Sequence, residues 1–490
     1  MTVRVPPSAN AAGRDAQEAA VTRAVAAGTR VHLVGAGGAG MSAIARVLLD
    51  RGLPVSGSDA RSSPTTEALA ARGARITIGH GAGAVAGAGV VVVSSAVRAA
   101  NPEVVAARAA GVPVVHRSAA LAALMAGARA VTVTGTHGKT TTTSMITMAV
   151  RAAGVDASYA IGGDLVSDGV NARHGSADVF VAEADESDGS FLAYAPAVCV
   201  VGNVEADHLD HYGTPQAVRA AFAALAGRIR PGGVAVAGTD DAGAEDWARE
   251  IAAARPDVRV VRVGRRDQDD VRIVDAAPAS PDRPTGPLPA ALPVLVHPGG
   301  RHVLRLAVPG RHNVTNAALA FAAGVAGLGL APADVLRGLA AFSGARRRFD
   351  RRGVVGGVTV VDDYAHHPTE VAAVVATARE VAGRGRVHIL FQPHLYSRTR
   401  IFAADFARAL TGADTVVSLD VYAAREDPEP GVDGRLVVAG VPQGQFVADR
   451  ARAVAAVVAA AVPGDLVLTV GAGDVGELAD DVLAALAARP

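Results

Sequence analysis

The chain has 490 residues with a hydrophobic content of 50%, and its 47 basic residues balance 47 acidic ones to a formal net charge of zero. The length favours about three domains, and the apolar content is ample for several cores. Zero net charge argues against a basic field that recruits nucleic acid and against an acidic solvating tail.

We expect no signal peptide or membrane span in this sequence. Residues 1–20 lack the apolar core of a signal peptide, and no run of about 18 apolar residues indicates a membrane span. We therefore expect a cytoplasmic protein that does not insert into membranes. The single cysteine, Cys199, lies in an apolar run and is expected to be a core residue rather than a nucleophile.

The first module begins with an expected strand at residues 30–34, a glycine-rich turn at 35–40 and a helix to Leu49. A second strand at 54–58 ends at Asp59. This is a complete dinucleotide fingerprint, because the glycines allow a diphosphate to approach the backbone and the acidic residue can bind a hydroxyl. It fits NAD and equally fits the diphosphate of another nucleotide conjugate.

A further strand of this module is expected at residues 90–93, ending at Ser94 and Ser95. Ligand contacts gather at strand carboxyl ends in an open parallel sheet. The two serines are therefore either ligand contacts or simple turn formers.

The second module contains Lys139, the only lysine in the chain, within the run Gly135-Thr136-His137-Gly138-Lys139-Thr140-Thr141. An expected strand at 130–134 precedes the run and a helix at 140–153 follows it. Backbone amides at such a turn and helix N-terminus face phosphate oxygens, and the Thr140 hydroxyl can ligate magnesium. A phosphate loop needs a compact point charge that arginine cannot imitate. The spacing departs from the standard loop, because Val133 stands where a glycine is usual.

Carboxylates follow two further strands of this module, expected at 178–182 and 197–201. The first strand leads to Glu183 and the acidic run up to Asp188, and the second leads to Glu205, Asp207 and His208. Because parallel strands end at one edge of a sheet, these groups are expected near the phosphates, where they suit a hard cation.

The remainder of the second module holds a proline-rich stretch at residues 276–300, which we expect to be a surface excursion without chemistry. The module closes at residues 309–316, which open an alanine-rich helix. A third pattern of strands, at 358–361, 387–391, 415–419 and 466–470, alternates with helices and predicts another doubly wound sheet. The adjacent His366 and His367 lack the Cys/His spacing of a zinc site.

Together these motifs resemble the Mur ligases of peptidoglycan synthesis over about residues 28–490. The resemblance is carried by the glycine run continuing into Met41 and Ser42, the Lys139 loop, the acidic run 183–188, residues 363–370 and residues 391–394. It implies an α/β fold of three domains, each built on a mainly parallel sheet. These are a Rossmann-like UDP-binding domain at 28–126 after an N-terminal extension at 1–27, a P-loop-type ATPase central domain at 127–344, and a Rossmann-like C-terminal ligase domain at 345–490.

The activity implied by the resemblance is an ATP-dependent, amide-forming ligation in the cell-wall pathway. ATP phosphorylates the lactyl carboxylate of UDP-N-acetylmuramate, and the amine of L-alanine then attacks the acyl phosphate. Magnesium at two sites, replaceable by manganese, is the implied cofactor. A monomer or homodimer is implied, with no nucleic-acid partner.

The resemblance also assigns residues of this chain. Catalytic roles fall to Lys139, Glu183, His208, Arg348, Asp363, His366 and Arg398. ATP-binding residues are Gly135, Thr136, His137, Gly138, Lys139, Thr140, Thr141, Asn313, Asn316, Arg348 and Asp363. Residues for the UDP-sugar are Gly35, Gly37, Gly38, Gly40, Met41, Ser42, Asp59 and Ser94. The metal ligands are Thr140 and Glu183 for one ion, and Glu183 with His208 for the second.

Two departures from the family pattern bear on these roles. Leu395 stands where some relatives have arginine, so a contact to the carboxylate of the amino acid would fall to Arg398 or elsewhere. The carbamoylated lysine of several sister ligases is impossible here, because Lys139 is the sole lysine. L-Alanine, glycine and L-serine stay open as substrates, since one methyl is worth only about 1–3 kcal/mol in a pocket.

Two other classes of protein remain alternatives. An NAD-dependent dehydrogenase would use the first fingerprint but leave the Lys139 loop without purpose. A non-catalytic nucleotide-binding protein would use both loops but would not need the catalytic residues of the third module.

Overall fold

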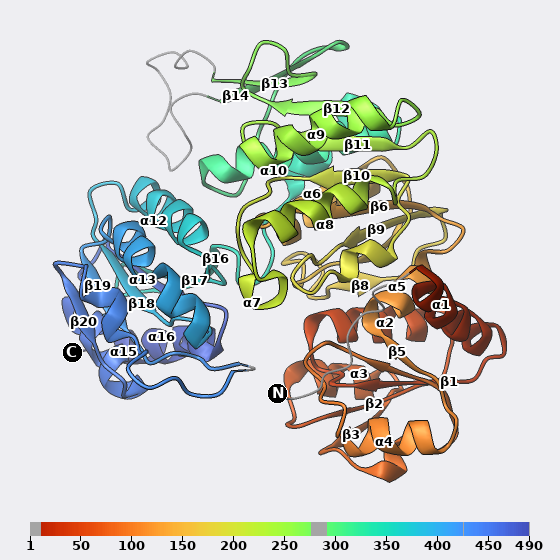
Figure 1. Cartoon of the computed structure of the whole chain (residues 1–490). Coiled ribbons are helices and arrows are strands. Elements are labelled where there is room, and N and C mark those ends of the chain that lie inside the picture. Colours follow the sequence, from red (N-terminus) through yellow and green to blue (C-terminus); the bar gives the residue numbers. More distant parts are fainter. Residues whose placement is uncertain (1–10, 276–291, 425, 490) are drawn as a thin grey trace. The chain divides into compact units, whose positions relative to one another are not determined.

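The structure, a computed structural model, describes residues 11–275, 292–424 and 426–489. They fall into two compact units (Figure 1). The first contains the described residues up to 275 with Pro293–Leu306 and Thr315–Phe342, and the second contains Ala307–Val314 and the described residues from Ser343 onward. In these ranges no helix is both long and apolar enough to cross a membrane.

The first unit begins with a parallel sheet in the order β3-β2-β1-β4-β5. Its strands are β1 Arg30–Val34, β2 Val55–Asp59, β3 Arg75–Ile78, β4 Ala88–Val93 and β5 Val114–His116. The helices between them are α2 Ala39–Asp50, α3 Pro64–Ala71, α4 Pro102–Ala109 and α5 Arg117–Met125. The strand order reverses between β1 and β4, which is where such sheets bind ligands. The predicted strands are confirmed, with Asp59 as the last residue of β2.

Helix α1, Ala11–Ala26, lies inside the predicted N-terminal extension. It packs against α5 and β5 and buries Ala20, Val21 and Ala24. The backbone N–H of His116 donates to Oε1 of Gln17 over 2.9 Å. The extension therefore supplies a helix to the first unit, a role that its composition did not indicate. The domain boundaries at 28, 127 and 345 stay predictions.

A second sheet of the first unit has the order β15-β14-β13-β12-β11-β10-β6-β9-β7-β8 in the described residues. It is parallel from β13 to β7, and β8, β14 and β15 pair antiparallel at its two ends. Central strands such as β10 read as unbroken apolar runs because both faces are buried. The strands are β6 Arg129–Thr134, β7 Ser158–Ala160, β8 Ala172–Arg173, β9 Val179–Glu183, β10 Val198–Val201, β11 Val234–Gly238, β12 Arg259–Gly264, β13 Val271–Asp275, β14 Pro293–His297 and β15 Gly300–Val303.

The prediction for the proline-rich stretch at residues 276–300 is corrected in part. Residues 276–291 lie outside the described residues, but β14 shows that 293–297 are a strand paired with β13. The prediction of an excursion over 276–300 was wrong for these residues, because proline is tolerated as the first residue of a strand, which is where Pro293 stands in β14.

Helices cover the second sheet on both faces (Figure 1). They are α6 Lys139–Ala152, α7 Leu209–Tyr212, α8 Pro215–Ala226, α9 Ala242–Ala254, α10 Arg311–Ala322 and α11 Pro332–Ala341. Helix α6, which starts at Lys139, packs closely on α11. A β-carbon on Gly338 of α11 would lie 2.5 Å from Cα of Ala149, so the two helix backbones meet there.

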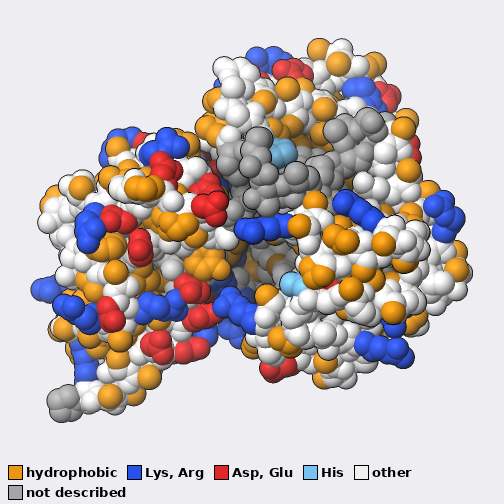
Figure 2. Space-filling model, turned by 60° about the horizontal axis from the view of Figure 1, so that its bottom comes forward, with side chains coloured by type: hydrophobic (Ala, Val, Ile, Leu, Met, Phe, Trp, Pro, Cys, Tyr) orange, Lys and Arg blue, Asp and Glu red, His pale blue; other side chains and the backbone are white. Residues whose placement is uncertain are grey.

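The second unit holds a sheet in the order β16-β17-β21-β18-β19-β20, parallel except at β16. Its strands are β16 Asp350–Val355, β17 Val358–Asp363, β18 Val387–Phe391, β19 Thr415–Ser418, β20 Gly444–Phe446 and β21 Leu466–Val470. Its helices are α12 Pro368–Ala382, α13 Tyr396–Leu410, α14 Arg435–Val438, α15 Arg450–Ala460 and α16 Leu478–Ala487. The predicted fold class of three mainly parallel sheets is confirmed. Arginine and acidic side chains share the visible surface with apolar ones (Figure 2).

The contact between α11 and α6 yields a stability prediction. Gly338→Ala should lower the thermal unfolding midpoint of the first unit, because a methyl group forced between two helix backbones costs about 1–3 kcal/mol. Gly83→Ala is the matched control, since a β-carbon there meets nothing within 4 Å. Equal midpoints for the two variants in a calorimetric scan would contradict the close helix contact.

Candidate functional site

The turn between β6 and α6 has a backbone that only glycine adopts easily. Gly135 has φ 128° and Gly138, the N-cap of α6, has φ 78°. A β-carbon at Gly135 would lie 2.9 Å from the carbonyl oxygen of Asn203. The turn thus exposes the amides at the start of α6, an arrangement that binds phosphate. Strand, glycine turn and helix are placed as the sequence predicted.

The ammonium of Lys139 is buried in this turn with three acceptors. Nζ donates to the carbonyl oxygens of Gly135, over 2.9 Å, and Thr136, over 3.2 Å, and to Oε1 of Glu186 over 2.9 Å. Burial alone would lower the pKa of Lys139, but the carboxylates of Glu186 and Asp185 outweigh it and raise the pKa above its ordinary value. The lysine is therefore a fixed, permanently charged group.

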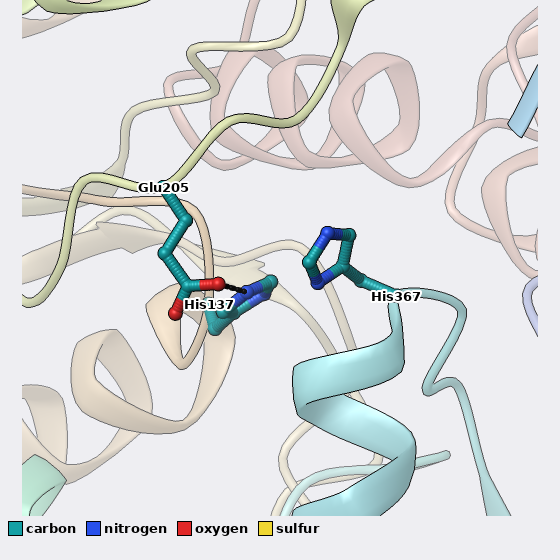
Figure 3. Close-up of side chains that lie close together, drawn as sticks. All are labelled: His137, Glu205 and His367. Atoms are coloured by element: carbon teal, nitrogen blue, oxygen red, sulfur yellow. Dashed lines mark ion pairs between the residues drawn. The ribbon is translucent and has the colours of Figure 1, made fainter. Parts of the chain in front are cut away.

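The loop after β10 braces the phosphate turn. Oδ1 of Asn203 accepts from the backbone N–H of His137 over 2.7 Å, and Nδ2 of Asn203 donates to the His137 carbonyl over 3.2 Å. The N–H of Glu205 donates to Oγ1 of Thr136 over 2.8 Å. Figure 3 shows the Glu205 carboxylate facing the His137 ring, at 3.4 Å between Oε2 and Nε2. The sequence indicated no such role for Asn203, because its amide only meets the turn in three dimensions.

The predicted metal ligands lie around the same sheet edge. Thr140 is buried at the start of α6, and Oε2 of Glu183, the last residue of β9, accepts from the N–H of Gly162 over 2.7 Å. His208 has φ 54° at the N-cap of α7, and its Nε2 lies 3.4 Å from Oε1 of Glu186. Hard carboxylate and hydroxyl oxygens next to a phosphate turn fit magnesium. The ring of His208 thus lies near Glu186 and Asp207, and its pairing with Glu183 stays a prediction.

The two asparagines predicted to bind ATP, Asn313 and Asn316, belong to different units. Asn316 lies against the phosphate turn, since a β-carbon on Gly138 would meet its Oδ1 at 2.6 Å. Thr141 is buried in the first turn of α6. In the second unit, Nδ2 of Asn313 donates to the Pro309 carbonyl over 2.6 Å. The structure therefore brings Asn316 to the turn, and ATP binding by Asn313 stays a prediction.

The glycine turn after β1 is closed by Asp59. Gly35 has φ 81°, and the N–H of Gly37 donates to Oδ2 of Asp59 over 2.9 Å. A β-carbon on Gly37 would come within 3.0 Å of that oxygen, so glycine is needed there. Gly38 is the N-cap of α2. The amides at this helix start are available to a diphosphate, as the fingerprint predicted.

Other predicted residues of this turn differ in exposure. Met41 and Ser42 are buried, and Met41 belongs to the hydrophobic core of the unit. Nδ2 of Asn171 donates to the Ala39 carbonyl over 2.8 Å and to Oγ of Ser42 over 3.3 Å. Ser94 directly follows β4 and has a half-buried side chain. Met41 is therefore placed for packing, and a contact of Ser94 with the UDP-sugar stays a prediction.

Sequence reasoning missed Arg117, which connects the two sheets of the first unit. Its guanidinium donates to Oδ2 of Asp185 over 2.7 Å and lies 3.6 Å from Oδ2 of Asp188. It also packs on the glycine turn, since a β-carbon on Gly40 would meet its Nη1 at 3.2 Å. Burial lowers the pKa of the neighbouring His116 to about 4, so this histidine is neutral. The acidic run 183–188 thus contacts both candidate nucleotide sites.

In the second unit, Arg348 and Asp363 lie together. Oδ2 of Asp363 accepts from the N–H of Phe349 over 2.6 Å, and Oδ1 from the N–H of Ala365 over 2.8 Å. Burial raises the pKa of Asp363 to about 6, against the opposing effect of the Arg348 charge. The Tyr364 ring lies 5.0 Å from the Arg348 guanidinium carbon and 4.7 Å from that of Arg347.

His366 and Arg398 gather around His394 in the same unit. Nη1 of Arg398 donates to Nδ1 of His394 over 3.3 Å, and the rings of His366 and His394 are 5.9 Å apart. Leu395 is buried with φ 70° at the N-cap of α13. The side chain of Leu395 therefore offers no polar group, and Arg398 is the arginine of this segment nearest the histidines.

Comparisons with known proteins agree with this geometry. Three family models match, described as "Mur ligase family, catalytic domain" at residues 30–129, "Mur ligase middle domain" at 133–324 and "Mur ligase, glutamate ligase domain" at 347–473. A UDP-N-acetylmuramate–L-alanine ligase of Kineococcus radiotolerans is 56% identical over 94% of this chain and 97% of its own. The ligase of that name from Paenarthrobacter aurescens is 54% identical over 91% and 94%.

A solved structure is also similar over nearly the whole chain. The crystal structure of a UDP-N-acetylmuramate–alanine ligase from Thermotoga maritima has a TM-score of 0.77 and 28% identity, covering 93% of this chain and 99% of that one. With all three family models matched in order, the chain belongs to the Mur ligase family.

Proposed function

We propose that this protein joins L-alanine to UDP-N-acetylmuramate, with ATP converted to ADP and phosphate, in peptidoglycan synthesis. The observation that carries the proposal is identity above 50% to ligases of that name over more than 90% of the chain. The site supports it, because one unit holds a diphosphate-type turn, a phosphate loop with a buried lysine and an adjacent acidic run.

The first step brings a carboxylate to the terminal phosphate of ATP, so the reacting groups repel one another. The residues of this chain offset that charge. Lys139 supplies a permanent positive charge, and the amides of the Gly135–Gly138 turn supply oriented dipoles. The product is an acyl phosphate, which the amine of L-alanine attacks to form the amide and release phosphate.

Magnesium supplies electrostatic stabilisation of phosphate oxygens when it is bound. Thr140 and Glu183 would hold one ion and Glu183 with His208 a second, with manganese as a substitute. The proposal of two ions rests on the family resemblance and on the clustering of these residues at one sheet edge. By the family resemblance, Arg348 and Asp363 of the second unit would bind ATP. His366 and Arg398 would have catalytic roles, and Arg398 is the candidate for holding the carboxylate of the amino acid.

The assay that tests the proposal measures ADP formation with UDP-N-acetylmuramate and each of L-alanine, glycine and L-serine. Turnover that requires the UDP-sugar and is fastest with L-alanine is the expected result. ADP formation independent of the UDP-sugar would contradict it. A dehydrogenase would instead change the absorbance of an added nicotinamide, and a binding protein would turn over no ATP.

The buried ammonium predicts that Lys139→Arg loses more than nine tenths of kcat despite keeping the charge, because the guanidinium is too wide for the glycine turn. A lost contact in the transition state is worth at least a factor of ten, about 1.4 kcal/mol. Steady-state kinetics check this. Arg249→Lys, at a side chain 66% exposed on α9, is the control with unchanged rate. A retained kcat above one tenth would contradict the point-charge role.

The Asp59 contact with Gly37 predicts a substrate-specific effect. Asp59→Ala, or a bulky residue at Gly38, should raise KM for the UDP-sugar and leave KM for ATP nearly unchanged. Glu67→Gln, on the exposed side of α3, is the control without effect on either constant. Equal rises in both KM values would mean that the two nucleotide sites are assigned wrongly.

The position of His208 predicts a defect in the first step. His208→Ala should slow acyl-phosphate formation itself, because the ring lies 3.4 Å from Glu186, which contacts Lys139 of the phosphate loop, and it would hold a cation there. The measurement is positional isotope exchange in ATP with the UDP-sugar present and L-alanine absent, in conditions where the unaltered protein shows exchange. Undiminished exchange in the variant would place His208 outside phosphoryl transfer.

A further inference from the structure

Glu186 is a buried carboxylate of the acidic run 183–188 without an individually predicted role, and it contacts the one lysine of the chain. Its side chain is 2% exposed. Oε1 accepts from Nζ of Lys139 over 2.9 Å and lies 3.4 Å from Nε2 of His208. The same oxygen therefore faces two residues that the proposed function places at the phosphates.

The backbone holds Glu186 firmly in this position. Its carbonyl oxygen accepts from the N–H of Gly189 over 3.0 Å and from the hydroxyl of Tyr212. Tyr212 ends α7, and His208 is the N-cap of that helix. One short helix thus fixes both the carboxylate and the histidine relative to Lys139.

The stability of the fold does not explain why the carboxylate of Glu186 is buried here. Its second oxygen, Oε2, is buried without a hydrogen-bond partner among the residues that the structure describes. A buried oxygen of a charged group that receives no donor destabilises the folded state. Such an oxygen points to a donor or cation that arrives with the substrates.

The donors of Lys139 show what the carboxylate does. Two N–H groups of the ammonium bind carbonyls of the turn itself, at Gly135 and Thr136, and these keep Nζ inside the loop. The third contact is with Glu186, which follows the neighbouring strand β9, so the ammonium is held between its own turn and that strand end. Glu186 thus helps to determine where the positively charged ammonium of Lys139 lies.

We propose that Glu186 is a positioning residue for phosphoryl transfer, which directs the Lys139 ammonium toward the terminal phosphate of ATP. The inference rests on the proposed function, since it acts through the role of Lys139 there. Glutamine at this position keeps the shape but removes the counter-charge, so only the two carbonyls of its own turn would hold Nζ firmly.

The test is a double-mutant cycle in kcat with Lys139→Arg, in the full chain with ATP, UDP-N-acetylmuramate and L-alanine. Glu186→Gln alone should lower kcat at least tenfold and change KM for the UDP-sugar less than twofold. In the Lys139→Arg background the same change should lower kcat less than threefold, because no ammonium is left to direct. A merely structural role would give additive losses.

Asp188→Asn is the matched control, since it removes a charge from the same acidic run but contacts Arg117 and not Lys139. Its effect should be equal in both backgrounds. If Glu186→Gln unfolds, Glu186→Asp keeps the charge, withdraws the carboxylate, and should show the same kcat loss and the same non-additivity.

Additive losses for Glu186→Gln and Lys139→Arg, or more than half of kcat left in Glu186→Gln, would overturn the inference. Failure of the proposed function is a different result. In that case the unaltered protein would not couple ADP formation to both the UDP-sugar and L-alanine.

Discussion

The structure around the phosphate loop depends on one buried ion pair, between Lys139 and Glu186. A lysine buried alone would lose its charge, and a carboxylate buried alone would take up a proton. The carboxylate of Glu186 helps to keep Lys139 charged, and two carbonyls of the turn complete the shell of the ammonium. This explains why lysine stands here in a chain that otherwise uses arginine, because a compact ammonium fits between closely spaced carbonyls and a planar guanidinium does not.

The acidic run 183–188 contacts both the phosphate loop and Arg117, which packs on the glycine turn of the other sheet. Glu186 binds the ammonium of the phosphate loop, whereas Asp185 and Asp188 bind Arg117 beside the glycine turn of the other sheet. The run follows β9 directly, so a rigid strand positions all three carboxylates. The short loop 185–188 therefore links charge at one candidate nucleotide site to charge at the other, which suits a reaction that needs both substrates together.

Much of the fold and the identity of the loops could be predicted from the sequence. Strands β18 and β21 match their predicted bounds because short apolar runs between turn residues are clear signals. The roles of Asn203 and Arg117 could not be predicted, because they arise where loops distant in sequence meet, and the residues themselves carry no spacing signal. Helix α1 was missed for a related reason, since its alanine-rich sequence has no marked apolar stripe.

The backbone next to Arg348 shows how the side chain of a candidate catalytic residue can be oriented by its neighbours. Arg347 and Phe349, on either side of it, have φ values of 60° and 48°, which are uncommon for residues other than glycine. Contacts away from Arg348 hold both residues. The guanidinium of Arg347 donates to the carbonyls of Gly471, over 2.7 Å, and Gly473, over 3.0 Å, and the N–H of Phe349 donates to Asp363. Strain of this kind persists only where surrounding contacts over-determine it. Since those contacts fix the backbone on both sides, the direction in which Arg348 leaves the chain is set before any substrate binds, and Asp363 serves to hold that backbone as well as to face the arginine.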